Sequence, residues 1–354
     1  MNSLNLYVID RTDGVIKGFS ECFEYQINRD YLTNEKSRFM PFVKIDVKDG
    51  DFLYAKTDNL TEKILYFGII ESFQNSEILC CDLYNIANFE IVTTKKSGTS
   101  YGMHIQNLLN FYLDSSKLVY RVNRTVDPSS NVNFAYIPKE PIETKNFIEY
   151  LIDGFKKYGV IWEVTSVTIA SDQDYAVNTT IKKVTDSIQI KANSETFINW
   201  EVYDNETDLK FENRLLIVNK NTNNSEAPGV LSTWYLKTDG TLTQNPNDGV
   251  FKPTKDKIYI YDLAQSNPPS YQEVAQSNLA GRTKSHEINF DLLKTGNLIS
   301  LDDIKIGMNA TISYDGKIYN SVLTGYEISS QNDYIHLRFG FIRSVLNSVL
   351  NKNN

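Results

Sequence analysis

Two stretches far apart in the sequence share one pattern, and this likeness determines the fold that we expect. Residues 50–56 read Gly-Asp-Phe-Leu-Tyr-Ala-Lys, and residues 63–79 read Lys-Ile-Leu-Tyr-Phe-Gly-Ile-Ile-Glu-Ser-Phe-Gln-Asn-Ser-Glu-Ile-Leu. Residues 307–314 read Gly-Met-Asn-Ala-Thr-Ile-Ser-Tyr, and residues 317–337 run from Lys-Ile-Tyr through Tyr-Glu-Ile-Ser-Ser-Gln-Asn to Tyr-Ile-His-Leu. Each copy predicts a strand, a turn, a long strand, a Gln-Asn turn and a further strand.

Two explanations of this likeness are open. Unrelated antiparallel hairpins resemble one another, because glycine, asparagine and alternating apolar residues serve any hairpin. Alternatively, the chain holds two similar β modules about 250 residues apart. That distance excludes a solenoid, whose repeats have periods of ~20 to 50 residues.

If the two copies arose by duplication, their strands and turns should have equivalent positions in the fold. Residues 63–73 and 317–328 should occupy equivalent places, and the turns at Gln74-Asn75 and Gln331-Asn332 should superpose. Ile78 and Ile335 should both point into cores, because the two-residue period of a strand fixes facing once the turn is fixed. One continuous sheet through both copies would instead indicate coincidence.

Outward from these copies, the pattern predicts a mainly β chain with an α+β insert. Short strands separated by turns predict a first β-barrel domain at residues 1–95. Residues 96–190 predict an α+β domain with two helices. Residues 191–343 predict a second β-barrel domain with a loop and helix insertion at about 220–298, and residues 344–354 a short C-terminal helix and tail.

The two helices of the α+β domain have different signals. In the first, Ile105, Leu108, Leu109 and Tyr112 recur at helical spacing. In the second, Thr144 is the expected N-terminal cap and Gly159 the expected C-terminal cap of an apolar stripe that begins at Phe147.

Size and charge exclude several classes of protein. At 354 residues the chain exceeds what one hydrophobic core usually organises, so two or three domains are expected. Lys and Arg number 36 against 44 Asp and Glu, a net charge of −8, which argues against sequence-specific DNA or RNA binding. Aromatic residues make up 12% of the chain, which favours a folded, β-rich protein.

Cysteines and apolar runs indicate where the protein is made. Cys22, Cys80 and Cys81 are too few for a disulfide framework, which suits synthesis in a reducing compartment such as the cytoplasm. The N-terminal residues lack a basic segment followed by an apolar run, and no apolar run approaches the ~18 residues that span a bilayer. We therefore expect no secretion signal and no membrane-spanning segment.

The residues that usually carry chemistry are scattered. His104, His286 and His336 lie far apart, without the spacing of metal ligands. Asp302-Asp303 and Asp49 with Asp51 offer paired carboxylates of the kind that glycosidases use, although acidic residues commonly flank turns.

The tryptophans have two possible roles. Trp162, Trp200 and Trp234, with Tyr235, could form a sugar-stacking platform, whereas strand tryptophans more often fill cores or interfaces. We assign no catalytic, cofactor-binding or metal-binding residue, expect no cofactor, and predict that the chain is not an enzyme.

The order of strands then resembles a known family. Residues 47–53 read Val-Lys-Asp-Gly-Asp-Phe-Leu and residues 66–72 read Tyr-Phe-Gly-Ile-Ile-Glu-Ser. Near the end come residues 307–312, then Tyr-Asn-Ser-Val-Leu-Thr-Gly-Tyr-Glu at 319–327 and Phe-Gly-Phe-Ile-Arg at 339–343. These segments resemble the tail hub proteins of phages, the N-terminal structural module of tail-associated lysins, which is similar to the baseplate hub of contractile-tailed phages.

The resemblance implies an assembly. It implies a homotrimer in which each protomer supplies two similar barrel domains, so that six barrels face a six-fold tail tube. The implied partners are a hexameric ring of distal tail protein and also the tape measure and receptor-binding proteins, at the distal end of the tail in the virion. The hub would open for phage DNA, which passes without specific binding because an acidic wall repels it.

Many members of this family continue into a cell-wall-cleaving domain, whereas this chain ends eleven residues after Arg343, so we expect a hub without a lytic domain. Two alternative functions stay open: a carbohydrate-binding adhesin that recognises a receptor, and a tail-associated cell-wall hydrolase.

Overall fold

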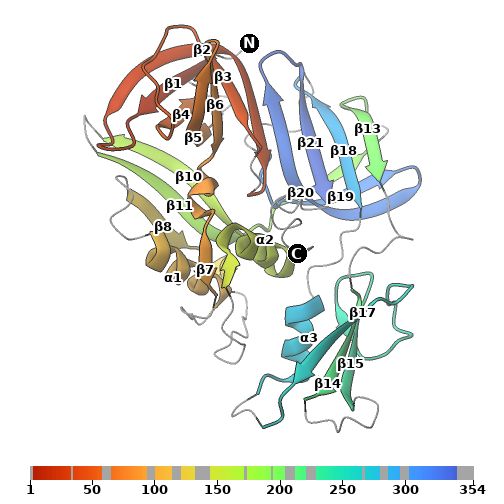
Figure 1. Cartoon of the computed structure of the whole chain (residues 1–354). Helices are drawn as coiled ribbons and strands as arrows, with labels where there is room; N and C mark the ends of the chain where they lie inside the picture. The colour runs from red at the N-terminus through yellow and green to blue at the C-terminus, as the bar shows by residue number, and fades with distance from the viewer. Residues whose placement is uncertain are drawn as a thin grey trace.

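The computed structural model consists mainly of β-strands, with three α-helices among the residues it describes (Figure 1). The described residues are 3–32, 35–57, 65–93, 100–113, 121–131, 144–170, 174–192, 194–203, 212–220, 229–264, 268–279, 286–295 and 303–340. The expected helix within 344–354 lies outside them. No helix in this part of the chain is long and apolar enough to cross a membrane.

The N-terminal module is a closed barrel of six strands. They are β1 (Leu4–Ile9), β2 (Ile16–Asp30), β3 (Ser37–Pro41), β4 (Phe52–Lys56), β5 (Leu65–Gln74) and β6 (Glu77–Asp82). Their spatial order is β1-β4-β5-β6-β3-β2, and a β1–β2 ladder closes the circle. Inward-facing side chains such as Leu6, Phe39 and Tyr66 fill the barrel.

The C-terminal module also has six strands among the described residues. They are β12 (Ser187–Lys191), β13 (Phe197–Tyr203), β18 (Glu287–Leu293), β19 (Asn309–Tyr314), β20 (Lys317–Ser329) and β21 (Tyr334–Gly340). Their spatial order is β12-β19-β20-β21-β18-β13. Trp200 of β13 stacks on Phe290 of β18, and its ring lies 5.4 Å from that of Tyr314 in β19, measured between ring centres.

The two modules have the same topology. In each, the first strand lies beside the fourth, followed by the fifth, sixth, third and second. The prediction of two similar β modules is therefore confirmed in strand order. The first strand differs in direction, since β1 is antiparallel to β4 whereas β12 is parallel to β19.

The turn before the fourth strand is the same in both modules. Gly50 and Gly307 have φ of 88° and 86°, which glycine adopts at little cost. Gly50 N donates to Ile70 O at 2.7 Å, and Gly307 N donates to Leu323 O at 2.8 Å. In return Ile70 N donates to Asp51 O and Leu323 N to Met308 O, both at 2.8 Å.

These bonds align the two copies and correct the alignment expected from sequence. The bulge in β5 falls between Ile70 and Ser72, and that in β20 between Leu323 and Gly325. Ile70 is therefore equivalent to Leu323, and the hairpin after it is longer in the C-terminal module. The prediction that the Gln74-Asn75 and Gln331-Asn332 turns superpose is wrong. Ile78 and Ile335 are both buried, as predicted.

The modules are also joined, which the sequence pattern did not indicate. The C-terminal end of β2 pairs with β20, so that backbone hydrogen bonds run from one module into the other. The expectation of two separate sheets is wrong, although the shared topology still supports duplication.

The α+β segment packs beneath the N-terminal module (Figure 1). It contains η1 (Leu83–Ala87), β7 (Glu90–Val92), α1 (Tyr101–Leu113), β8 (Arg121–Val126), η2 (Pro128–Ser130), β9 (Thr144–Asn146), α2 (Phe147–Tyr158), β10 (Val160–Ala170) and β11 (Asp174–Lys183). Asn146 caps α2 by accepting hydrogen bonds from the amides of Ile148 and Glu149, so the expected Thr144 cap is wrong. Gly159 closes α2 as predicted.

A small inserted sheet interrupts the C-terminal module between β13 and β18. It contains β14 (Arg214–Asn219), β15 (Val230–Leu236), β16 (Leu242–Thr243), β17 (Asp256–Tyr261) and α3 (Tyr271–Leu279), with a core of its own around Leu215 and Leu279. The insertion therefore starts before the expected residue 220, and the expected boundary at 190 falls within β12.

Candidate functional site

Among the described residues, the junction of the two modules is the main candidate site. β2 and β20 pair from Gln26 with Ser329 to Asp30 with Gly325. The ladder is extended at both ends, because Tyr31 N donates to Thr324 O and Ser330 N donates to Tyr25 O, each at 2.9 Å. A joint made of backbone hydrogen bonds fixes the relative orientation of the modules.

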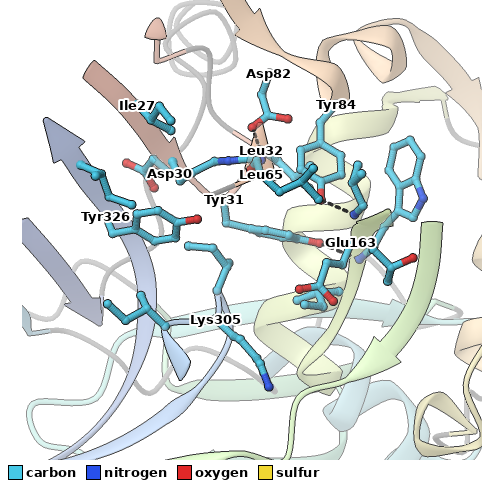
Figure 2. A pocket seen from close by; sticks show the side chains of 18 of the residues that line it. Ile27, Asp30, Tyr31, Leu32, Leu65, Asp82, Tyr84, Glu163, Lys305 and Tyr326 are labelled. Atoms are coloured by element: carbon cyan, nitrogen blue, oxygen red, sulfur yellow. Dashed lines mark hydrogen bonds and ion pairs between the residues drawn. The ribbon is translucent and has the colours of Figure 1, made fainter. Parts of the chain in front are cut away.

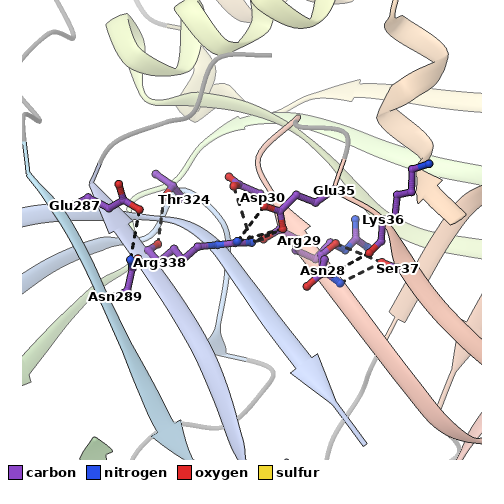
Figure 3. Close-up of polar contacts among 10 residues, drawn as sticks. All are labelled: Asn28, Arg29, Asp30, Glu35, Lys36, Ser37, Glu287, Asn289, Thr324 and Arg338. Atoms are coloured by element: carbon purple, nitrogen blue, oxygen red, sulfur yellow. Dashed lines mark hydrogen bonds and ion pairs between the residues drawn. The ribbon is translucent and has the colours of Figure 1, made fainter. Parts of the chain in front are cut away.

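Arg338 crosses this junction from β21 (Figure 3). Both of its terminal nitrogens donate to the carboxylate of Glu35 at 3.1 Å, and Asp30 lies 3.9 Å away. A Cβ at position 325 would lie 2.8 Å from Arg29 O and from Arg338 Nε, so Gly325 lets the strand and the guanidinium approach. This fork geometry makes an oriented clamp between the modules.

Arg29 points the other way, into the N-terminal module. It forms an ion pair with Asp82, donates to Leu65 O at 3.3 Å and lies 5.2 Å from the centre of the Tyr66 ring. Burial acts to lower the pKa of Arg29, but the Asp82 carboxylate and the neighbouring tyrosines Tyr326, Tyr84 and Tyr66 together outweigh it, and the pKa is raised. The guanidinium therefore stays charged beneath the ladder.

A cavity of about 370 Å³ lies beside this junction (Figure 2). Its lining comes from the N-terminal module, from η1, from β10, from the segment before β19 and from β20. Trp162 N donates to Tyr31 Oη at 3.3 Å, and Val164 N donates to Tyr84 Oη at 3.1 Å. Burial raises the pKa of Tyr31, Tyr84 and Tyr326, so these phenols stay neutral.

Charged groups of the cavity lining form ion pairs, Asp82 and Arg29 with each other and Glu163 and Lys305 with residues outside the lining. Asp82 pairs with Arg29, Glu163 with Lys182, and Lys305 with Asp186. Paired charges and neutral phenols bridge three parts of the chain, and this arrangement suits a structural joint better than acid–base catalysis.

A second feature is a belt of aromatic side chains on the outside of the barrel. The aromatic belt consists of the exposed side chains Phe19, Phe23, Met40, Phe42 and Val43 with the half-buried Tyr7, and it adjoins the buried Tyr54. Tyr7 lies 5.1 Å from Phe19 and 5.9 Å from Tyr54, and Phe23 lies 5.9 Å from Phe42, measured between ring centres. Phe42 is 76% exposed and Val43 is 56% exposed. Contiguous exposed apolar surface marks a protein contact.

The histidines are placed in three separate sites. His104 contacts Tyr150 Oη at 2.9 Å, His286 contacts Ser321 Oγ at 2.9 Å, and His336 contacts Asp291 Oδ1 at 2.8 Å. Within the described ranges, no three His, Cys, Asp or Glu side chains gather to hold a metal ion.

The candidate carboxylates do not form a pair. Asp51 is buried, where it accepts from Lys48 N at 2.9 Å and forms an ion pair with Lys17 at 2.8 Å, so it stabilises the turn. Asp49 lies in this same turn, Asp303 is exposed far along the chain, and Asp302 lies outside the described residues.

The tryptophans serve different cores. Trp162 is buried beside Tyr84, Trp200 stacks on Phe290, and Trp234 packs against the core of the inserted sheet with Tyr235 next along the strand. The structure brings none of these residues together as a platform.

Sequence reasoning missed both the junction and the aromatic belt. A signal for the belt is present in β2, where Phe19, Glu21 and Phe23 alternate with the smaller residues Ser20 and Cys22. The small side chains face inwards and the phenylalanines face outwards. A pattern that exposes its largest apolar residues indicates a contact with another molecule.

Comparison with known proteins gives a consistent result at the level of structure. No known family model matches the sequence, and no curated protein matches it. The fold resembles a chain of the phage P2 baseplate in its activated conformation with Ca, at a TM-score of 0.51 and 13% identity, over 96% of this chain and 98% of that one.

Two further solved structures have the same fold. The tail protein from Neisseria meningitidis MC58 has a TM-score of 0.53 and 13% identity, over 96% of both chains. The 43 kDa tail protein of prophage MuSo2 from Shewanella oneidensis has a TM-score of 0.51 and 12% identity, over 96% of this chain and 98% of that one. The chain therefore has the fold of phage baseplate and tail proteins, and the expected multi-domain, mainly β architecture is confirmed.

Proposed function

We propose that this chain is a structural protein of a phage tail that forms a trimeric hub at the distal end. The observation that carries the proposal is the pair of β modules with one topology, joined rigidly by the β2–β20 ladder. Three such chains present six similar modules, which suits a partner with six-fold symmetry. The shared fold of baseplate and tail proteins supports the same role.

The hub attaches to a hexameric ring of distal tail protein and opens for DNA. Its aromatic belt offers apolar surface for assembly contacts, and the net charge of −8 repels DNA from the wall of a conduit. The tape measure and receptor-binding proteins are further partners. Because the charged groups at the junction are paired with one another, we propose no enzymatic activity.

Mass in solution tests the proposal. Native mass spectrometry of the purified chain, alone and with the distal tail protein of the same phage, should give about three times 40.5 kDa for the hub component. A complex of three hub chains with six partner chains would support ring attachment. A monomer at all concentrations, with and without the partner, would overturn the hub.

The exposed aromatic belt also favours a second candidate, a carbohydrate-binding adhesin, because sugars stack on exposed rings. A glycan array distinguishes the two. Sugar binding that is lost in Phe42→Ser would support the adhesin, whereas binding of the distal ring that is lost in this variant would support the hub.

A further inference from the structure

We propose that residues 341–350 of this chain pack on the exposed apolar face of the inserted sheet, and that they strap this sheet to the C-terminal module. The contact lies within one chain, so it does not depend on the proposed trimer.

The inserted sheet is apolar on both of its faces. One face packs against α3, in the core around Leu215 and Leu279 (Figure 1). Because successive side chains of a strand point to opposite faces, the alternate residues of β14 and β17 point away from α3. These outward residues are Leu216, Val218, Ile258 and Ile260, together with Val230 of β15, and we call them the free face.

The free face is exposed although its sequence is typical of a covered one. Ile258 is 62% exposed, Ile260 67% and Val230 51%. Parallel strands such as β14 and β17 are usually covered on both sides, and they then read as continuous apolar runs. Residues 215–218 read Leu-Leu-Ile-Val and residues 258–261 read Ile-Tyr-Ile-Tyr. This composition indicates that a further segment covers the free face.

The charges that flank the free face favour an apolar occupant. Arg214 and Asp256 stand two positions before its residues in β14 and β17, and they form an ion pair. Lys220 and Asp262 stand two positions after them and pair at 2.7 Å. Since these flanking charges neutralise one another, a segment with an apolar stripe suits the face better than a charged one.

The segment that follows Gly340 starts beside the inserted sheet's two connections. Tyr203, the last residue of β13, pairs with Glu287, and Glu287 pairs with Gly340. The chain leaves for the inserted sheet after Tyr203 and returns from it before Glu287, so residue 341 begins where both connections begin.

The length of this segment is sufficient to reach the sheet. Leu279 at the end of α3 lies about as far along the chain from Glu287 as Val349 lies from Gly340. An extended run of that length spans up to ~30 Å.

The sequence of this segment, which lies outside the described residues, matches the free face. Residues 341–350 read Phe-Ile-Arg-Ser-Val-Leu-Asn-Ser-Val-Leu, with apolar pairs at 341–342, 345–346 and 349–350. Pairs that recur every four residues form one stripe of a helix. A helix this short is marginal in water and gains its stability from packing. Of the two exposed apolar surfaces, the aromatic belt belongs to the other module, whereas the free face belongs to the unit that connects beside Gly340.

This contact gives the inserted sheet a third connection. In the described part of the chain, its strands pair only with one another, and its core is separate from that of the two modules. Residues 341–350 therefore set its orientation relative to the C-terminal module, with α3 on one face and the strap on the other.

Crosslinking of the full chain with a short bismaleimide tests this contact. Val230→Cys places a thiol at the free face, and Asn351→Cys places one directly after the apolar stripe. The native thiols should not react, because Cys22, Cys80 and Cys81 are buried, and burial raises the pKa of Cys22 and of Cys81 to about 11. We expect a monomer band on a denaturing gel and, by mass spectrometry after digestion, a peptide that joins positions 230 and 351.

Matched variants make the test specific. Leu346→Ser in the apolar stripe should reduce this link several-fold, whereas Asn347→Ser, between the apolar pairs, should keep it. Phe42→Cys with Asn351→Cys should not link, although Phe42 is 76% exposed. Absence of the 230–351 link, or equal linking from positions 42 and 230, would overturn the proposal. Covalent dimers would show that another copy covers the free face, which would also overturn it.

Discussion

The two β modules share a strand order, yet only the N-terminal one closes into a barrel. Its β1 leads into a tight hairpin, in which Asp10 N donates to Val15 O at 2.8 Å, and pairs with both β2 and β4. β12 arrives instead from the α+β segment, runs parallel to β19, and does not pair with β13 among the described residues. Five strands therefore keep the same order and direction in both modules. Only the first strand differs, because β1 runs antiparallel to its neighbour β4 whereas β12 runs parallel to β19.

The closed and the open module therefore offer different surfaces. The closed module supplies a rigid barrel with an aromatic belt, and the open one keeps β13 as a free edge. Met40 of the belt corresponds to Asp291 in the other module, because Phe39 and Phe290 occupy the same register position. At this position the C-terminal module therefore has a carboxylate where the aromatic belt has an apolar side chain.

The greatest loss of stability should come from the buried ion pair that the two modules do not share. Arg29→Met leaves Asp82 buried without its cation, and breaking such a pair costs about 3–5 kcal/mol of unfolding free energy. Arg338→Met should cost less, because its partner Glu35 is more exposed. Urea denaturation of both variants measures the difference. Equal losses would show that the two arginines play the same part in their modules.

The shared turn allows a direct test of how alike the modules are. Alanine at position 50 or 307 must adopt a positive φ, at a cost of about 1–2 kcal/mol. At position 307 the new Cβ also lies 3.0 Å from Val184 and 3.3 Å from Phe155, whereas at position 50 it meets the flexible end of Arg11. Gly307→Ala should therefore lower the midpoint of thermal unfolding more than Gly50→Ala. The opposite order would contradict the tighter surroundings of position 307.

The aromatic belt should matter for binding and hardly for stability. Phe42→Ser removes a ring that is 76% exposed, so the unfolding free energy should change by no more than about 0.5 kcal/mol. Binding to the distal ring, followed by calorimetry, should weaken. Ile318→Ser, an equally exposed change in the C-terminal module, is the control and should leave binding unchanged.

A still smaller change concerns the hairpin that closes the N-terminal module. Hydrogen bonds from the Thr12 hydroxyl and amide lower the pKa of Asp10 to about 2, below the ~3.9 of an unfolded chain. The stability that this carboxylate contributes is present above pH 4 and is lost as the pH falls from 4 towards 2. Thr12→Ala raises the pKa of Asp10. The midpoint of thermal unfolding of this variant should therefore fall less between pH 4 and pH 2 than that of the unchanged protein. An unchanged pH profile would exclude this contribution.

Much of the fold could be predicted from the sequence because strands and helices are local. The alternation in β21 and the apolar stripe of α2 identified those elements, and Gly50 and Gly307 revealed the repeat. The alignment within the repeat failed because asparagine suits any turn, so the Gln-Asn dipeptides matched at different hairpin lengths.

The candidate site could not be predicted in the same way. The junction depends on β2 meeting β20, and nothing in the alternation of β2 distinguishes the half that stays in the barrel from the half that leaves it. Arg29 and Arg338 look alike in sequence, although one faces its own barrel and the other crosses to its neighbour.

The β2–β20 ladder also has a consequence for synthesis. Its two strands are separated by about 300 residues, so the ribosome releases β2 long before β20 exists. A nascent chain can complete the N-terminal barrel from local hairpins, but the outer half of β2 then waits with its edge uncovered. A chain that lacks β20 cannot form this ladder, so the two modules are joined only after nearly the whole chain has been made.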